Sequence, residues 1–101
     1  ILKNEGKIDF HDSANKILAK INALNPNPGA WFEVNKERYK VWKAEIINES
    51  NQPGKIINDN LAIACGKKSI QILEIQKEGK NKQNIREFLL DNKIKKNQII
   101  N

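Results

Sequence analysis

Methionine is absent from this chain, and cysteine, histidine and tyrosine each occur once. The single cysteine, Cys65, excludes an intrachain disulfide and suits a reducing compartment such as the cytoplasm. One cysteine and one histidine cannot supply the four ligands of a structural zinc site. No apolar run approaches the roughly 18–20 residues of a membrane span, so we expect no membrane partner. The sequence thus excludes disulfide-rich scaffolds and zinc modules.

Complete catalytic constellations are also missing from the sequence. His11 lies between Asp9 and Asp12, but no nucleophile accompanies it, so we expect it to face solvent rather than to exchange protons. The segment Gly66-Lys67-Lys68-Ser69 resembles the end of a phosphate loop, yet the preceding glycine and the strand-to-helix context are lacking. Cys65 lies in an apolar run and is expected to be a buried small hydrophobe. The sequence therefore assigns neither a catalytic residue nor a metal ligand.

The chain carries a formal net charge of +6 on 101 residues, a length that suffices for one domain with a single core. An excess of basic residues favours an anionic partner, and nucleic acid is the commonest one. Composition offers a second explanation, because Lys, Asn and Ile supply 47 of the 101 residues and all three have A/T-rich codons. The charge therefore indicates nucleic-acid binding only if the lysines cluster in space.

The apolar pattern predicts one helix followed by short strands. Apolar residues recur at helical spacing behind a cap at Asp12 or Ser13, and Asn25-Pro26 ends this helix. The stripe consists of Ala14, Ile17, Leu18, Ile21 and Leu24. Five strands are expected at Ala30–Val34, Arg38–Asn48, Lys55–Asn58, Leu61–Cys65 and Ser69–Gln76. Asn84 and Glu87 have the spacing of a capping box before a short C-terminal helix.

These elements predict a mainly β domain built as a small barrel. The alternation in Arg38–Asn48 is imperfect, which predicts a β-bulge of the kind that a closed barrel needs. We expect Phe32 and Trp42 in its core, although aromatic residues can also serve as stacking platforms for nucleic acid. Residues 1–7 are interpreted as the end of a linker, residues 8–92 as the domain and residues 93–101 as a polar tail. The start reads as a cut fragment or linker because it has neither an initiator methionine nor a signal-peptide core.

A set of short motifs follows in a fixed order between residues 7 and 90. They are Ile8-Asp9-Phe10, Ala23-Leu24-Asn25-Pro26, Pro28-Gly29-Ala30-Trp31-Phe32, Lys40-Val41-Trp42-Lys43-Ala44, Pro53-Gly54-Lys55-Ile56, Ile63-Ala64-Cys65-Gly66, Leu73–Lys80 and Glu87-Phe88-Leu89. In this order and spacing they resemble the C-terminal domain of methionyl-tRNA formyltransferases over nearly the whole chain. The sequence departs from that family at several positions; Asn22, for example, stands where an arginine is usual.

The resemblance implies a small OB-like five-stranded β-barrel with an N-terminal entrance helix and a short C-terminal helix. In that family a linker joins the barrel to an N-terminal formyltransferase domain of the same polypeptide. The N-terminal domain binds the co-substrate 10-formyltetrahydrofolate and carries the catalytic residues. The whole enzyme transfers the formyl group to the methionine amino group of initiator Met-tRNA in translation initiation. The resemblance implies that this fragment positions the tRNA, as a cytoplasmic monomer, and does not catalyse by itself.

The basic residues form two groups around the predicted strands and one in the tail. Lys36, Arg38, Lys40 and Lys43 lie in and after the first hairpin, whereas Lys67, Lys68, Lys77, Lys80 and Lys82 bracket the strand Ser69–Gln76. We predict that these nine residues include the phosphate contacts of the tRNA, which position nucleic acid without reading its sequence. Lys40 and Lys43 have opposite parity, so they share one face of the sheet only if the strand contains a bulge.

Two alternatives remain open from the sequence. The first is the matching domain of a related enzyme that formylates an amino sugar or processes formyltetrahydrofolate, in which the barrel would serve a small-molecule site or subunit packing. The second is a freestanding OB-type module that binds RNA or protein. The net charge of +6 favours tRNA over the small-molecule alternative.

Overall fold

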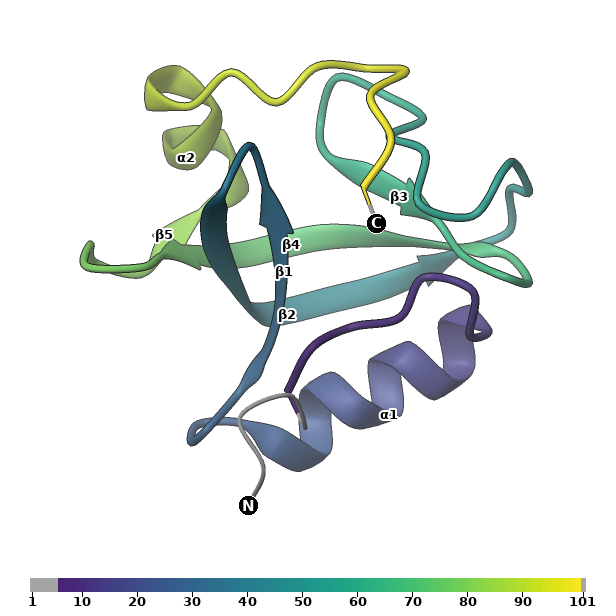
Figure 1. Cartoon of the computed structure of the whole chain (residues 1–101), viewed down its shortest axis with the longest axis horizontal. Coiled ribbons are helices and arrows are strands. Elements are labelled where there is room, and N and C mark those ends of the chain that lie inside the picture. Colours follow the sequence, from purple (N-terminus) through teal and green to yellow (C-terminus); the bar gives the residue numbers. More distant parts are fainter. Residues whose placement is uncertain (1–5, 101) are drawn as a thin grey trace.

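The computed structural model describes residues 6–100, which fold around one antiparallel sheet. The elements are α1 (Ala14–Leu24), β1 (Ala30–Val34), β2 (Glu37–Ile47), β3 (Ala62–Ala64), β4 (Ser69–Lys77), β5 (Gln83–Asn84) and α2 (Ile85–Asp91). The strand order is β1-β2-β4-β3, and β5 pairs with β4. Figure 1 shows the sheet curled into a half-barrel, with α1 below the sheet and α2 above strand β5. The predicted mainly β class with two flanking helices is confirmed.

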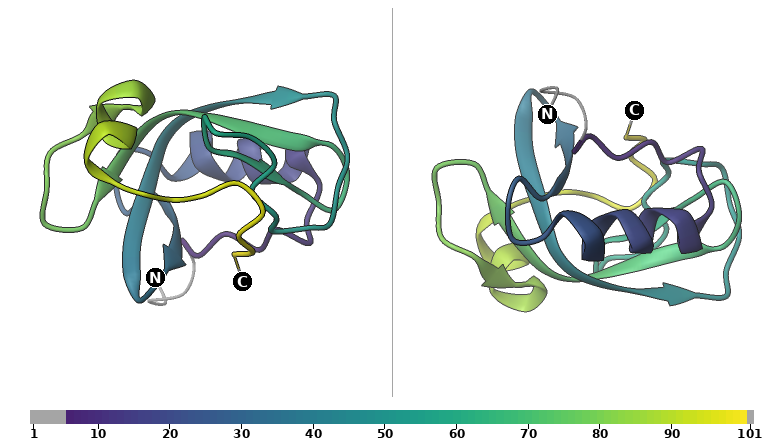
Figure 2. Two further views of the ribbon diagram at one scale, coloured as in Figure 1. Left: turned by 90° about the horizontal axis from the view of Figure 1, so that it is seen from above. Right: turned by 90° about the horizontal axis from the view of Figure 1, so that it is seen from below.

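Helix α1 begins and ends where its sequence predicts. The Ser13 hydroxyl accepts a hydrogen bond from the backbone N–H of Lys16 at 3.2 Å and so caps the first turn. Ala14, Ile17 and Ile21 form its buried face. The helix ends before Pro26, and the Asn25–Pro26 and Asn27–Pro28 peptide bonds are both cis. Figure 2 shows α1 on one side of the molecule and the C-terminal segment on the opposite side.

The predicted β-bulge is present in β2. Val41 pairs with Ile75 of β4, and the next paired residue, Lys43, faces Glu74. Trp42 is therefore an extra residue on β2 at this point. A second irregularity follows directly, because Ala44 pairs with Ile72 and Leu73 of β4 has no partner.

The bulge keeps the apolar side of β2 pointing inward although the parity of the sequence changes. Before the bulge Val41 is fully buried, and after it Ala44 and Ile46 pack against the same core cluster. The residues between these apolar positions consequently point outward. Lys40 and Lys43 thus lie on the same outer side of the sheet, which their opposite parity allows only because β2 contains a bulge.

A row of four aromatic rings crosses the core. Phe10 meets Phe32 edge-on with ring centroids 6.0 Å apart, and Phe32 stacks on Tyr39 at 5.7 Å. Tyr39 in turn contacts Phe88 of α2 edge-on at 5.5 Å. These are favourable aromatic geometries, and all four side chains are buried. The row joins the entrance segment, the sheet and the C-terminal helix, and the expected burial of Phe32 is confirmed.

Residues 6–14 connect two distant parts of the sheet. At one end the backbone N–H of Ile8 donates to the carbonyl of Trp31 in β1 at 2.8 Å. At the other end the N–H of Gly66, in the turn between β3 and β4, donates to the carbonyl of Asp12 at 2.8 Å. The entrance segment is therefore paired to both ends of the half-barrel.

One predicted strand is wrong. Lys55–Asn58 forms only isolated bridges, Lys55 with Ile99 and Ile56 with Ile63. The fifth strand is instead β5, two residues long, which pairs with Glu74 and Ile75 of β4. The segment Lys55–Asn58 is shared between two partners, because Lys55 bridges Ile99 in the C-terminal segment while its carbonyl accepts a hydrogen bond from the N–H of Ala64 at 2.9 Å. A contact so far along the chain cannot be predicted from a local pattern.

The C-terminal segment, interpreted above as a polar tail, packs on the body of the domain. Ile94 and Ile100 are buried, and the N–H of Ile100 donates to the carbonyl of Gly54 at 2.8 Å. Gly54 has a φ of +88°, and a Cβ there would collide with the carbonyl of Ile100. The proposed division at residues 7 and 92 stays a prediction.

Candidate nucleic-acid interface

Three of the nine predicted basic residues lie over two tryptophans on the outer side of the sheet. The guanidinium carbon of Arg38 is 3.8 Å from the centre of the Trp31 ring. The Nζ atoms of Lys40 and Lys82 are 4.1 Å and 4.8 Å from the centre of the Trp42 ring. Cations at such distances are attracted by the negative face of an indole. We call this surface the tryptophan face, defined by Trp31, Arg38, Lys40, Trp42, Gln76 and Lys82.

The pairing of β1 with β2 explains how the tryptophan face arises. Trp31 is directly opposite Lys40, while Arg38 is opposite Glu33, two positions along β1 from Trp31. Arg38 is thus a diagonal neighbour of Trp31 on one face of the pair, within reach of a long side chain. Alternation along β2 places Arg38, Lys40 and Trp42 on that same face.

Hydrogen bonds fix the second tryptophan. The Nε1–H of Trp42 donates to Oε1 of Gln76 on β4 at 2.9 Å, and Gln76 donates to the carbonyl of Lys80 at 2.8 Å. Lys82, which also lies over this ring, is 3.7 Å from a carboxylate oxygen of Glu74. The indole of Trp42 is therefore held in place, and the charge of Lys82 is partly balanced.

Lys40 is held along its whole length. Its Nζ donates to the carbonyl of Pro26, and its stem passes so close to Gly29 that a Cβ there would lie 2.8 Å from Lys40 Cδ. Gly29 also has a φ of +88°, which disfavours any other residue. Position 29 thus requires a glycine for two reasons, its positive φ and the side chain of Lys40 that passes over it.

The tryptophan face borders a surface hollow of about 360 Å³. Pro28, Trp31, Arg38, Lys40, Glu78 and Gly79 are among the residues that line it. Two cations and one carboxylate therefore share the hollow, which leaves it with a positive charge. A positively charged concavity of this kind suits an anionic group of a partner.

The other predicted residues are distributed more widely. Lys36 lies in the turn between β1 and β2, and Lys43 is exposed on the outer side beyond Trp42. Lys77 and Lys80 line a second hollow, of about 440 Å³, that also contains the carboxylate of Asp91.

Lys67 and Lys68 lie far from the tryptophan face. The strand that follows them, β4, begins at Ser69 opposite Ile47 and ends at Lys77 opposite Tyr39. The length of β4, nine residues of extended chain, thus separates Lys67 and Lys68 from Lys80 and Lys82. The structure brings Arg38, Lys40 and Lys82 together and leaves Lys67 and Lys68 at the opposite end of the sheet.

The packing of basic side chains on the two tryptophans is not among the features predicted from the sequence. The expectation that Trp42 lies in the core is wrong, because this residue is half-buried on the outer side and packs under two lysines. Trp31 is half-buried on the same side. Side chains alternate along a strand, so Trp42, which follows the inward-facing Val41 directly, is expected on the outer side.

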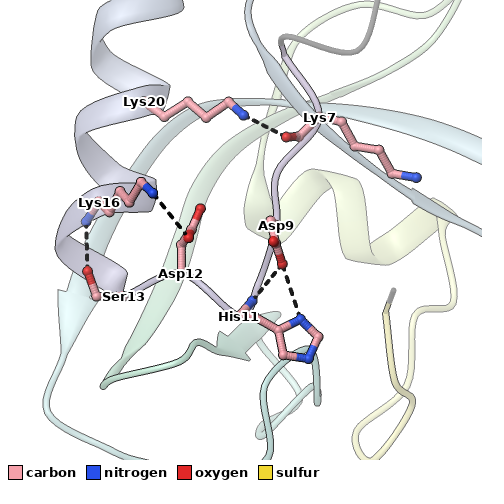
Figure 3. Close-up of polar contacts among 7 residues, drawn as sticks. All are labelled: Lys7, Asp9, His11, Asp12, Ser13, Lys16 and Lys20. Carbon is pink, nitrogen blue, oxygen red and sulfur yellow. Dashed lines mark hydrogen bonds and ion pairs between the residues drawn. The ribbon is translucent and has the colours of Figure 1, made fainter.

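The entrance region shows no catalytic geometry around His11. Asp9 accepts hydrogen bonds from the backbone N–H of His11 at 2.9 Å and from its Nδ1 at 3.1 Å, and both side chains are exposed (Figure 3). The backbone N–H of His11, followed by its ring, holds the pKa of Asp9 below its usual range. The nearby polar contacts serve the helix, since Lys16 lies 3.3 Å from Asp12 and also donates its N–H to Ser13.

Two further observations concern residues 6–100 only. Within this range no three histidine, cysteine, aspartate or glutamate side chains gather in a way that could hold a metal ion. Neither described helix is long and apolar enough to cross a bilayer.

The fold and this face define a small mainly β domain whose curled sheet presents basic side chains on tryptophans. The chain belongs to the family described as the formyl transferase C-terminal domain, whose model matches residues 1–93. The resemblance read from the sequence motifs is confirmed.

Curated relatives agree with this assignment. The chain is 50% identical over 95 residues to the methionyl-tRNA formyltransferase of Pelagibacter ubique, covering 93% of this chain and 31% of that protein. It is 40% identical over 102 residues to the methionyl-tRNA formyltransferase of Rickettsia massiliae, covering 99% and 34%. The chain thus spans about a third of the length of the curated relatives it matches.

Solved structures share the fold. A crystal structure of HypX from Aquifex aeolicus in complex with tetrahydrofolic acid superposes with a TM-score of 0.73. The sequence identity is 15%, and the match covers 97% of this chain and 21% of that one. At this identity the likeness establishes the shared fold alone.

Proposed function

We propose that this chain is the tRNA-binding C-terminal domain of a methionyl-tRNA formyltransferase. The single observation that carries the proposal is the tryptophan face, where Arg38 and Lys40 of β2 converge with the distant Lys82 on one side of the sheet. Relatives at 40% and 50% identity are methionyl-tRNA formyltransferases, and their name identifies tRNA as the nucleic acid that this surface would bind.

In this proposal the domain binds the initiator tRNA through its phosphates. Lys40 and Lys43 share the outer side of β2, and Arg38 and Lys82 extend the positive surface on either side of them. Such contacts fix the position of the nucleic acid and do not read its sequence. The body of a tRNA is mostly duplex, which proteins recognise by shape and backbone.

The chemistry is assigned to another part of the parent enzyme. We propose that an N-terminal domain of the same polypeptide binds 10-formyltetrahydrofolate and transfers its formyl group to the methionine amino group of initiator Met-tRNA. In this proposal the C-terminal domain holds the tRNA during that transfer and contributes no catalytic residue. The protein would act in translation initiation, in the cytoplasm and as a monomer.

A titration of labelled tRNA with the 101-residue chain at a series of salt concentrations tests the proposal. Phosphate contacts release counterions, so the logarithm of the association constant should fall by about 0.7–0.9 per contacted phosphate for each tenfold rise in salt. We expect weak binding with little sequence preference and a slope corresponding to several phosphates. Salt-independent binding, or no binding at low salt, would contradict the proposal.

A further inference from the structure

Arg38, the arginine on the tryptophan face, is oriented by packing but has no ion-pair partner among residues 6–100. Its guanidinium is fixed over Trp31 at 3.8 Å, yet the side chain is exposed. Within residues 6–100 the ion pairs join His11 to Asp9, Lys16 to Asp12 and Lys82 to Glu74, and no carboxylate pairs with Arg38. Arg38 is thus oriented by packing while its charge remains available to a partner.

The platform under Arg38 is itself held rigidly. The backbone N–H of Trp31 donates to the carbonyl of Gly6 at 2.8 Å, and its carbonyl accepts from Ile8 at 2.8 Å. The indole lies directly against Gly6, because a Cβ on that glycine would be 2.9 Å from Cδ1 and 3.0 Å from Nε1 of Trp31. Lys7 lies 5.9 Å from the centre of the same ring.

Arginine differs from lysine in how it binds a phosphate. Its planar guanidinium presents N–H donors at its edge in a fork that matches two phosphate oxygens, whereas an ammonium acts as a point charge. A guanidinium stacked over an indole keeps its edge free for such a fork. The stacking also restricts the rotamers of Arg38 before binding, which reduces the entropic cost of the contact.

We infer that the hollow between Trp31, Lys40 and Glu78 receives one backbone phosphate of the bound polynucleotide, with Arg38 as its bidentate ligand and Trp31 as the positioning residue for Arg38. This inference rests on the proposed function and names one contact within it. Trp31 acts through the arginine and does not stack on a base. Lys40, which lines the same hollow, adds a second positive charge.

Four variants and one control test the inference by tRNA titration over a range of salt concentrations. The variants are Arg38→Ala, Arg38→Lys, Trp31→Leu and the double variant Trp31→Leu/Arg38→Ala. The control is Arg86→Ala, which removes the other arginine of the chain from an exposed position on α2. Thermal unfolding of each variant checks that the fold persists.

Arg38→Ala should weaken binding by roughly tenfold, the range expected for hydrogen bonds to a charged group. It should also reduce the salt slope by about 0.7–0.9, one phosphate's share. Arg38→Lys should keep the slope but lose affinity, because the charge stays and the fork is lost. Trp31→Leu should weaken binding less than Arg38→Ala, and the double variant should bind no worse than Arg38→Ala alone.

Three results overturn the inference or its premise, and they are distinguishable. If Arg38→Ala binds as tightly as Arg86→Ala while the unmodified chain binds tRNA, the phosphate site is wrong and the proposed function stands. If the losses from Trp31→Leu and Arg38→Ala multiply in the double variant, Trp31 contacts nucleic acid itself. If the unmodified chain does not bind tRNA at low salt, the proposed function fails together with the inference. Should Trp31→Leu not fold, the comparison of alanine, lysine and control variants still decides the phosphate site.

Discussion

The ring of Phe88 on α2 meets the ring of Tyr39 on β2 edge-on, with 5.5 Å between their centroids. This contact ends the aromatic row that begins at Phe10, and it attaches the short C-terminal helix to the sheet. Only Phe88 is buried among the residues of α2, whereas Leu90 two positions later is 86% exposed. One helix thus offers a buried and an exposed apolar side chain for comparison.

Phe88→Ala should lower the free energy of unfolding by about 3–5 kcal/mol, because it removes a buried ring and leaves a cavity. The control Leu90→Ala, on the same helix, should change it by less than about 0.5 kcal/mol. Chemical denaturation followed by far-UV circular dichroism measures both values. Equal effects of the two substitutions would mean that α2 is not anchored through Phe88.

Glu78→Gln should strengthen tRNA binding, because it removes the one carboxylate among the lining residues named for the hollow beside Arg38 and Lys40. The same titration on Glu49→Gln provides the control, since Glu49 is exposed and lies beyond the opposite end of β2 from Arg38. We expect a several-fold gain for the first variant, equivalent to about 1 kcal/mol or less for an exposed charge, and a smaller change for the second. An unchanged or weakened affinity for Glu78→Gln would place the nucleic acid elsewhere.

Burial raises the pKa of the Cys65 thiol to about 11, against an ordinary value of 9.0. Well below pH 9 the thiol is protonated in both the folded and the unfolded state, so it adds no pH dependence. Between pH 9 and 11 the unfolded chain releases this proton and the folded chain retains it, so stability falls as the pH rises. Burial also raises the pKa of Tyr39, which acts in the same direction.

Comparison with Cys65→Ala isolates the contribution of the thiol. The unmodified chain should lose more stability than Cys65→Ala across this window, by on the order of 2 kcal/mol. Urea denaturation of both proteins at pH 8 and pH 10.5 measures the difference. Identical losses would show that the thiol does not remain protonated in the folded chain.

The sequence predicted most elements of this fold because their signals are local. The Ser13 cap and the apolar stripe define α1, and Asn84 caps α2 by accepting from the N–H of Glu87 at 2.9 Å. The imperfect alternation of apolar residues in β2 predicted the β-bulge. A local pattern could not predict the bridge between Lys55 and Ile99, because Ile99 lies near the other end of the chain.

The candidate site was predicted less completely. The prediction for Arg38, Lys40 and Lys82 rests on their charge and on their positions around the expected strands, and these do not show which basic residues converge. The small number of aromatic residues, six in all, favours a core position for Trp42, whereas the alternation with Val41 directs this residue outward. The placement of Lys67 and Lys68 at the far end of β4 depends on strand register, which the sequence does not state.

The most direct test of the account is a pair of double charge reversals measured by tRNA titration at low salt. Lys40→Glu/Lys43→Glu changes two residues on the outer side of β2, and Lys93→Glu/Lys95→Glu changes two exposed lysines of the C-terminal segment by the same total charge. The account predicts that the first pair weakens binding substantially more than the second and also lowers the salt slope more. Equal losses from the two pairs would contradict it, because the lysines would then act only as a diffuse positive charge.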